Sequence, residues 1–368
     1  MQMTDYLPLP GTPIEDLDTP CIIVDLDVAE SNIAKLQAAA NDMGIDVRPH
    51  SKTSKSPYWV RKQIEAGAIG VCCAKLGEAE VMVEAGILDV MIPNQVIGTS
   101  KIARLIAIAK SANIIVAVED SGNIDDLSDA AKAAGVELGV IVEVNVGMDR
   151  CGVDGHNALD LAKQIELAPG LRFDGLMGYE GHVVAERDFE IRKTEAEKSM
   201  GILMGAAQKI RDAEIEVKIV SAAGTGTYNI SGRYPGVTEL QCGSYIFMDG
   251  DYLEVFDDFE PALSVLSTVI SRQKKDVAIV DMGLKSISMD RGLAEVISPS
   301  NASIMKHSEE HTKIALSDVD SQSLKIGDKV RSRPTHGDTT INLHEHYFGV
   351  RNGKLEEVIE IPGRGKFR

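Results

Sequence analysis

Short runs of β-forming residues recur along the first two thirds of the chain, and most of them are nearly continuous in apolar side chains. Such runs are typical of parallel strands that helices cover on the outside. Eight of them are present: Val47–Lys52, Ile69–Lys75, Asp89–Gln95, Asn113–Glu119, Leu138–Gly147, Phe173–Gly181, Val217–Gly224 and Glu239–Phe247.

Segments with helical periodicity separate these runs. Several end at a glycine, such as Gly67, Gly86 or Gly135, which can adopt the left-handed conformation that stops a helix. Only Tyr228–Thr238, between the last two runs, lacks a convincing helix. The predicted helices are Tyr58–Ala66, Glu78–Ala85, Ser100–Ser111, Asn123–Ala134, Asn157–Leu167 and Asp188–Ala213.

This alternation of strands and helices predicts an α/β fold with a (β/α)8 TIM barrel. The alternative is an open doubly wound sheet, which would need fewer strands and usually carries a glycine-rich first turn for phosphate. No GxGxxG motif follows the first run, so the sequence favours the barrel.

From about Ser264 the pattern changes to β-forming segments separated by turns, which predicts a C-terminal antiparallel β domain. Its expected strands are Leu263–Arg272, Asp276–Asp281, Thr312–Ala315, Asp328–Ser332 and Tyr347–Arg351. The early run Cys21–Asp25 precedes a predicted helix at Val28–Asp42, and we expect this run to join the β domain. The predicted organisation is a barrel over 28–258 and a β domain built from 1–27 plus 259–368.

The composition narrows the class of partner. Hydrophobic residues make up 44% of the 368 residues, charged residues 26%, and the net charge is -18. An acidic surface repels phosphate backbones and anionic lipids, so we expect neither nucleic acid nor a membrane as partner. A small anionic ligand would need a local cationic pocket.

The N-terminal segment has neither a basic start nor an apolar core, and no apolar run is long enough to cross a bilayer. The five cysteines are odd in number and lie mostly in strand-like runs. This usage indicates reduced thiols and a cytoplasmic location.

Chemistry-bearing residues gather where the predicted strands end, which is where a barrel places its active site. Lys52 ends the first strand beside Arg48 and His50, two neighbours that would favour the neutral amine that attack on a carbonyl requires. A solvated surface lysine is the alternative, and Lys55 and Lys75 lie near enough in the sequence to compete for the role.

Two further strand ends offer polar groups. Arg150 follows the fifth strand on a glycine-flanked turn, from which it could reach a phenolate or carboxylate, or pair with Asp149. Tyr179, Glu180 and His182 lie at the end of the sixth strand and offer stacking and acid–base chemistry.

The seventh and eighth strands end in small residues that expose backbone N–H groups and hydroxyls, a combination suited to phosphate. Adjacent phosphate loops after these two strands are a recurrent barrel arrangement. The residues concerned are Gly224, Thr225 and Gly226 after the seventh strand, and Gln241, Gly243, Ser244 and Tyr245 in the eighth.

His336 and Asp338 lie two residues apart in the predicted β domain. If this segment is a strand, both side chains face the same side and could ligate a divalent cation such as Mn²⁺ or Mg²⁺. A surface hydrogen bond between them is the alternative. His344 and His346 share the same spacing and are a weaker candidate pair.

These segments occur together in one order: Thr19-Pro20, Val24–Asp27, Arg48–Lys52, Gly70–Cys73, Gly147–Val153, Gly224–Gly226, Gly243–Tyr245 and His336–Asp338. In combination they resemble the D-threonine aldolase and D-serine dehydratase family of fold-type III pyridoxal 5′-phosphate enzymes, whose fold is alanine-racemase-like. The resemblance extends from about Thr19 to the end of the chain.

The resemblance implies a role for each matched residue and a homodimer. Lys52 would hold the cofactor covalently, Arg150 would contact its 3′-oxygen side, Tyr179 would lie near the ring, and Gln241 near the ring nitrogen. Thr225, Gly243 and Ser244 would bind the phosphate, and His336 and Asp338 the metal.

The identity of residue 338 indicates which reaction and substrate to expect. Within the family, aldolases look like they pair histidine with aspartate at the metal, whereas dehydratases look like they pair it with cysteine. An oxygen ligand favours Mn²⁺ or Mg²⁺ over Zn²⁺. The resemblance therefore implies a lyase that cleaves a D-3-hydroxy amino acid, of the D-threonine or 3-hydroxy-D-aspartate type, to glycine and an aldehyde.

Three other functions stay open. The first is a dehydratase of D-serine or D-3-hydroxyaspartate, and the second is an amino-acid racemase with a tyrosine base such as Tyr252 or Tyr347. The third is a non-enzymatic carrier of the cofactor.

The chain departs from the family pattern at three places. Ala74 and Ser54 replace a glutamine and a histidine, and Glu180 and His182 replace a different arrangement of histidines around Tyr179. The catalytic base is therefore not carried over, and we expect His182 or a water on the metal to act as base.

Overall fold

The computed structural model describes residues 7–317 and 322–368. Residues 1–6 and 318–321, which the sequence analysis assigned to the β domain, lie outside the described residues. The chain divides into two compact units. The barrel unit holds Ala34–Lys52, Trp59–Gly243 and Gly365–Arg368, and the β unit holds Thr53–Tyr58, Ser244–Arg364 and the chain before Ala34.

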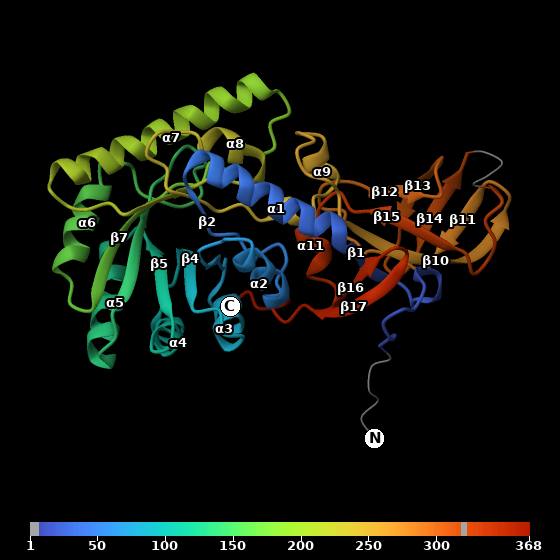
Figure 1. Ribbon diagram of the computed structural model, residues 1–368, viewed down its shortest axis with the longest axis horizontal. Helices are drawn as coiled ribbons and strands as arrows, with labels where there is room; N and C mark the ends of the chain where they lie inside the picture. The colour runs from blue at the N-terminus through green and yellow to red at the C-terminus, as the bar shows by residue number, and fades with distance from the viewer. Residues whose placement is uncertain (1–6, 318–321) are drawn as a thin grey trace. The chain divides into compact units, whose positions relative to one another are not determined.

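Eight parallel strands form the sheet of the barrel unit in the order β2-β9-β8-β7-β6-β5-β4-β3 (Figure 1). A parallel bridge between His50 and Cys72 joins the two ends of this order. It is flanked by hydrogen bonds from the Ser51 amide to the Cys72 carbonyl (2.8 Å) and from the Cys72 amide to the Pro49 carbonyl (2.9 Å). The sheet therefore closes, which confirms the predicted barrel and excludes the open sheet.

The strands are β2 (Asp46–Val47), β3 (Val71–Cys72), β4 (Asp89–Gln95), β5 (Asn113–Val118), β6 (Leu138–Glu143), β7 (Leu171–Met177), β8 (Ile219–Ala222) and β9 (Glu239–Leu240). Most are shorter than the apolar runs that predicted them, because the residues at their carboxyl ends leave the ladder for loops.

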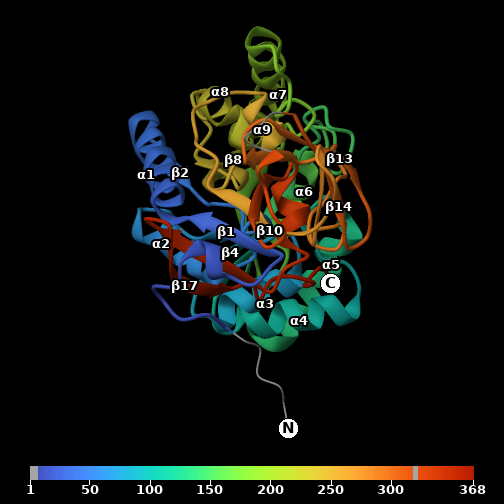
Figure 2. The same ribbon diagram turned by 90° about the vertical axis from the view of Figure 1, so that its right-hand side faces the viewer.

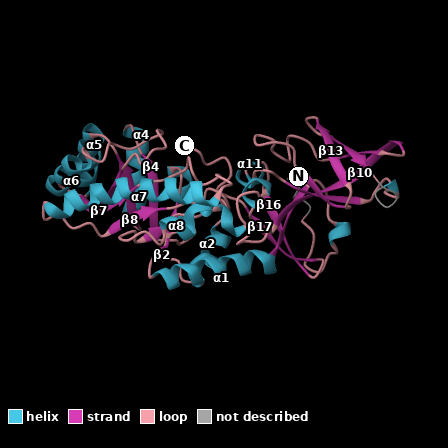
Figure 3. Ribbon diagram, turned by 90° about the horizontal axis from the view of Figure 1, so that it is seen from above, coloured by secondary structure: helices cyan, strands magenta, loops and turns pink. Residues whose placement is uncertain are grey.

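The helices of the barrel unit surround these strands (Figure 3). They are α2 (Pro57–Glu65), α3 (Leu76–Glu84), α4 (Thr99–Ala109), α5 (Ser121–Ala134), α6 (Ala158–Leu167), α7 (Phe189–Asp212) and α8 (Tyr228–Ser231). Helix α8 is a single turn within Tyr228–Thr238, the stretch in which the sequence showed no convincing helix. No helix in the described ranges is both long and apolar enough to span a bilayer.

Two apolar layers explain why the barrel strands are nearly continuous in hydrophobic residues. In β5, Ile114, Val116 and Val118 pack into a large cluster with the surrounding helices. The alternate residues Ile115 and Ala117 pack in a small cluster inside the barrel with residues of the neighbouring strands. Both faces of the strand are buried, as helix-covered parallel sheets require.

The β unit contains a mostly antiparallel sheet in the order β13-β14-β11-β10-β1-β16-β17, with β12 and β15 paired to each other and β15 to β10 (Figure 2). Its strands are β1 (Cys21–Asp25), β10 (Leu263–Lys274), β11 (Val277–Val280), β12 (Glu295–Ser298), β13 (Ala302–His307), β14 (Thr312–Leu316), β15 (Lys329–Arg333), β16 (His346–Arg351) and β17 (Lys354–Glu360).

Strand β1 joins this sheet, as the sequence predicted, although it enters from the other end of the chain. It pairs antiparallel with β10 but parallel with β16. The prediction of a purely antiparallel domain is therefore wrong for the pairing of β1 with β16. Helix α1 (Leu26–Met43) follows β1 directly, and the chain passes from the β unit to the barrel unit within it.

Candidate active site

Tyr179, in the loop after β7, is contacted by two cations from other strand ends of the barrel. The Lys52 Nζ, just beyond β2, lies 5.6 Å from the centroid of its ring. The Arg150 guanidinium carbon, in the loop after β6, lies 5.5 Å from the same centroid. The carboxyl ends of β2, β6 and β7 thus bring together three residues that the sequence analysis selected, at the end of the barrel where active sites form.

Neither cation is consumed by an ion pair at close range. In the part of the chain that the structure describes, neither Lys52 nor Arg150 forms an ion pair, and Asp149 accepts a hydrogen bond from the Asn145 side chain instead (2.9 Å). Two positive charges near one aromatic ring, in a protein of net charge -18, suit a small anionic ligand with a ring that can stack.

The environment of Arg48 differs from the one that the sequence predicted. Its side chain is buried and bonds to Glu239 (3.2 Å) and to Asp89, so its charge is matched within the sheet. It therefore does not act as a free positive charge beside Lys52, as the sequence analysis expected.

The loop that carries Arg150 is held by several acceptors. Asn145 Oδ1 accepts hydrogen bonds from the Gly147 and Asp149 amides, at 3.0 and 3.2 Å. Gly147 has φ +117°, and a side chain there would lie 3.1 Å from the His182 Nε2. His182 therefore packs directly against this loop, so a second candidate residue lies beside the one that carries Arg150.

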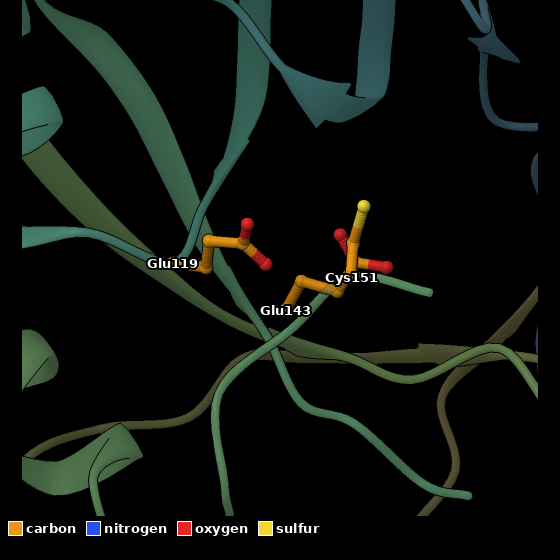
Figure 4. A group of neighbouring side chains, drawn as sticks. All are labelled: Glu119, Glu143 and Cys151. Atoms are coloured by element: carbon orange, nitrogen blue, oxygen red, sulfur yellow. The ribbon is translucent and has the colours of Figure 1, made fainter. Parts of the chain in front are cut away.

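Glu119, Glu143 and Cys151 lie under the same loop, with their ligand atoms all within 4.8 Å of one another (Figure 4). Burial raises the pKa of Glu143. Both carboxylates already accept hydrogen bonds from the chain, Glu143 from Gln95 (2.5 Å) and Glu119 from the Gly152 amide. We interpret this cluster as an anchor for the loop.

The cysteines allow a prediction about thiol reactivity. Cys151 is half-buried and the other four are buried, and burial raises the pKa of Cys21 to about 12. Only the thiolate reacts, so a raised pKa slows labelling. Burial also raises the pKa of Cys151, but this thiol is the more accessible one. We therefore expect a thiol reagent to label Cys151 first in the native protein. Rapid labelling of a Cys151→Ser variant would contradict this expectation.

Glu180 has a role that the sequence did not reveal. It is fully buried, its Oε1 accepts from the hydroxyls of Thr227 (2.7 Å) and Ser231, and its Oε2 accepts from the Ala223 amide (3.3 Å). The carboxylate therefore ties the β7 end to the loop Gly224–Thr227. Burial and these donors give Glu180 a structural role and do not favour the acid–base option that the sequence offered.

We expect Glu180→Gln to lower the free energy of unfolding by about 1–3 kcal/mol. The glutamine amide replaces one acceptor oxygen with a nitrogen that cannot accept a hydrogen bond, so at least one of the three donors loses its acceptor. Urea unfolding measures this loss. Glu166→Gln, at an exposed position of α6, is the matched control and should be neutral. Equal stability of the two variants would show that the loop does not depend on Glu180.

Gln241 is the last member of a buried chain of hydrogen bonds. Its Nε2 donates to Ser221 Oγ (2.8 Å), and Ser221 donates to Glu239 (2.7 Å), which Arg48 neutralises. This series of hydrogen bonds fixes the orientation of the Gln241 amide.

The remaining phosphate candidates lie where the two units meet in the sequence. Gly243 is the last residue of its segment in the barrel unit, and Ser244 and Tyr245 belong to the β unit. The Tyr245 ring packs on Phe259, with 5.6 Å between the ring centroids.

The metal candidates lie in the β unit, in a conformation that differs from the expected strand. His336 is extended (φ -131°, ψ 110°) and Asp338 lies in the first turn of helix α11 (Gly337–Ile341). Strand alternation therefore does not pair them. Between them, the Gly337 amide donates to the buried Asp249 (2.8 Å), whose pKa burial raises to about 6.

Asp338 has an oxygen that the protein leaves unused. Its Oδ1 is buried and has no hydrogen-bond partner among the described residues. A buried carboxylate oxygen without a donor is costly unless something binds it. Such an oxygen suits a hard or borderline divalent cation, and His336, two residues away in the sequence, could supply a second ligand.

Comparison with known proteins identifies the family. The model of the alanine racemase N-terminal domain matches residues 24–251, and that of a serine dehydratase domain matches residues 262–350. The 3-hydroxy-D-aspartate aldolase of Paracoccus denitrificans (strain Pd 1222) is 40% identical over 98% of this chain and 96% of its own. The D-threonine aldolase of Arthrobacter sp. is 37% identical over 97% of this chain and 95% of its own.

The chain belongs to the family of the D-threonine and 3-hydroxy-D-aspartate aldolases.

Structural comparison agrees. The D-threonine aldolase from Filomicrobium marinum superposes with a TM-score of 0.94 at 37% identity and covers 97% of this chain and 99% of its own. The D-threo-3-hydroxyaspartate dehydratase of Delftia sp. HT23 superposes with a TM-score of 0.87 at 25% identity, over 95% and 98%. The resemblance seen in the sequence and the alanine-racemase-like fold are confirmed, and the family is one of lyases.

Two alternative residues are engaged elsewhere. Tyr347, a candidate racemase base, is fully buried and donates to the Ser54 carbonyl (2.6 Å). His344, from the weaker metal pair, donates its Nε2 hydrogen to the Ser286 carbonyl (2.7 Å). Tyr347 cannot act as a base without losing this partner. The bond of His344 occupies only Nε2 and leaves the lone pair of Nδ1.

Proposed function

We propose that this protein is a pyridoxal 5′-phosphate- and divalent-metal-dependent lyase that cleaves D-3-hydroxy amino acids, of the D-threonine or 3-hydroxy-D-aspartate type, to glycine and an aldehyde. The observation that carries the proposal is the unpartnered Asp338 oxygen beside His336. It offers an oxygen ligand in a chain whose relatives at 37–40% identity are aldolases.

Lys52, Arg150 and Tyr179 would hold the cofactor, since they place two unpaired cations and an aromatic ring together. Gly224, Thr225 and Gly226, with Gly243, Ser244 and Tyr245, would supply the phosphate contacts. Gln241 would face the ring nitrogen with the amide that Ser221 orients. When bound, the cofactor supplies an electron sink for the pair released as the Cα–Cβ bond breaks.

Two groups of the chain would handle the proton of the substrate hydroxyl. His336 and Asp338 would hold the metal, which would supply Lewis-acid chemistry at the β-hydroxyl. The imidazole of His182 would accept that proton, and its contact with the Gly147 loop fixes its position.

We further propose that the metal is Mn²⁺ or Mg²⁺, with Zn²⁺ less favoured. The protein would act in the cytoplasm as a homodimer. Five free cysteines, four of them buried, support a reducing compartment. Size-exclusion chromatography with light scattering tests the dimer.

The identity of the second ligand gives a direct test of the metal assignment. A thiolate is a softer ligand than a carboxylate, so Asp338→Cys should shift the preference of the metal-stripped enzyme from Mn²⁺ toward Zn²⁺. The measurement is the activity restored by each metal in the two proteins. An identical order of metals in both would contradict ligation by Asp338.

A dehydratase is the second candidate. The D-threo-3-hydroxyaspartate dehydratase of Delftia sp. (strain HT23) is 30% identical over 76% of this chain and 74% of its own. Such an enzyme would use the same Lys52 but expel the hydroxyl, so ammonia and a keto acid would replace glycine as products.

A further inference from the structure

His336 is oriented by a carboxylate outside the proposed ligand pair. Its Nδ1 lies 2.6 Å from Asp290 Oδ2, and its side chain is only 18% exposed. A carboxylate can only accept in this contact, so Nδ1 carries the hydrogen. The Nε2 of a neutral imidazole is then left as the nitrogen with a lone pair.

Asp290 is itself held in place. Its second oxygen, Oδ1, accepts hydrogen bonds from Ser288 Oγ (2.7 Å) and from Thr339 Oγ1 (2.9 Å). Thr339 belongs to α11, the helix that His336 precedes. One oxygen of Asp290 is thus fixed by two hydroxyls while the other receives the imidazole.

The loop that carries Asp290 is bonded to the His336 segment on both sides. The Ser288 amide donates to Thr340 Oγ1 (3.1 Å), and Thr340 in turn donates to the His336 carbonyl (2.9 Å). On the other side, Thr335 Oγ1 donates to the Gly292 carbonyl (2.8 Å). The carboxylate and the imidazole therefore belong to one hydrogen-bonded assembly within the β unit.

We propose that Asp290 is a positioning residue for the metal site: it holds His336 with Nδ1 protonated, directs Nε2 to the metal and raises the basicity of Nε2. A partner of this kind commonly changes metal affinity 10–100-fold. The proposal rests on the proposed function, because it takes His336 as a ligand.

The test is the Mn²⁺ dissociation constant of the full-length protein loaded with pyridoxal phosphate, measured from the free-Mn²⁺ electron paramagnetic resonance signal without substrate. Asp290→Ala removes the acceptor and should weaken Mn²⁺ binding roughly 10-fold or more. Asp290→Asn keeps a neutral acceptor and should fall between this variant and the wild type. Glu295→Gln, which disturbs an exposed ion pair with Arg333, is the control and should bind as the wild type does.

The graded order separates positioning from a merely structural role, provided that the unfolding midpoints without metal are compared in parallel. Equal Mn²⁺ affinity of Asp290→Ala, Asp290→Asn and the wild type, with binding lost in His336→Ala, would overturn the role of Asp290 alone. Wild-type affinity in His336→Ala and Asp338→Ala would instead overturn the metal site of the proposed function, and the role of Asp290 with it.

Discussion

Replacing Lys52 with alanine should lower kcat for cleavage of a D-3-hydroxy amino acid on the order of 10⁴-fold, because the variant loses its covalent attachment point and the amine that moves protons there. The Nζ of Lys52 lies 5.6 Å from the Tyr179 ring centroid and has no ion-pair partner among the described residues, so it is available for this role. The measurement is kcat together with the absorbance of the cofactor bound to the purified protein.

Lys55→Ala and Lys75→Ala are the matched controls, since both lysines lie near Lys52 in the sequence and were considered for its role. Both variants should keep kcat within a few-fold of the wild type and retain the cofactor absorbance. Loss of the absorbance in Lys75→Ala, with wild-type behaviour in Lys52→Ala, would move the attachment point to the end of β3.

Asp338→Ala should reduce metal-stimulated cleavage about 10²–10³-fold while leaving the cofactor bound, because the loss of Lewis-acid assistance costs several kcal/mol. The buried Oδ1 of Asp338 has no protein donor to lose, so the fold should tolerate the change. The measurement compares activity with and without added Mn²⁺ and records the cofactor absorbance of the same samples.

Asp276→Ala is the control for this variant, because Asp276 is an exposed aspartate of the same unit, in the turn between β10 and β11. It should respond to Mn²⁺ as the wild type does. Unchanged stimulation in Asp338→Ala would show that the metal binds elsewhere, and the substrate argument built on its carboxylate would fail.

The barrel was predictable because both faces of its strands are buried. The central residues of a strand such as β4, Val90, Met91 and Ile92, are therefore apolar and buried, and its predicted bounds, Asp89–Gln95, agree with the structure. The predicted runs extended too far at β6 and β9, because the residues that follow are still apolar although they leave the ladder.

The missed strands of the β unit have weaker patterns. In β17, Lys354–Glu360, charged residues occupy most positions, and only Leu355 and Ile359 are buried. Strand β12, Glu295–Ser298, has four residues and buries only Val296. Such strands are specified by their neighbours in the sheet, and these are distant in the sequence.

The site residues likewise divide into those that the sequence could predict and those that it could not. Lys52, Arg150 and Tyr179 lie at or just after the ends of predicted strands, so the barrel topology alone brings them to one end. Glu180 and Asp290 act through hydrogen bonds to segments 43 and 46 residues away, and nothing in their local sequence indicates these partners. The helix at Gly337 was missed because five residues are too few to show a periodicity.

The measurement that tests the account most directly is a product assay of the purified protein with pyridoxal phosphate and Mn²⁺. D-threonine and D-3-hydroxyaspartate are supplied separately, and glycine and ammonia are quantified in the same samples with and without a chelator. The account predicts glycine without ammonia, and loss of glycine when the chelator is present. Ammonia and a keto acid without glycine, or glycine that persists in the chelator, would contradict it.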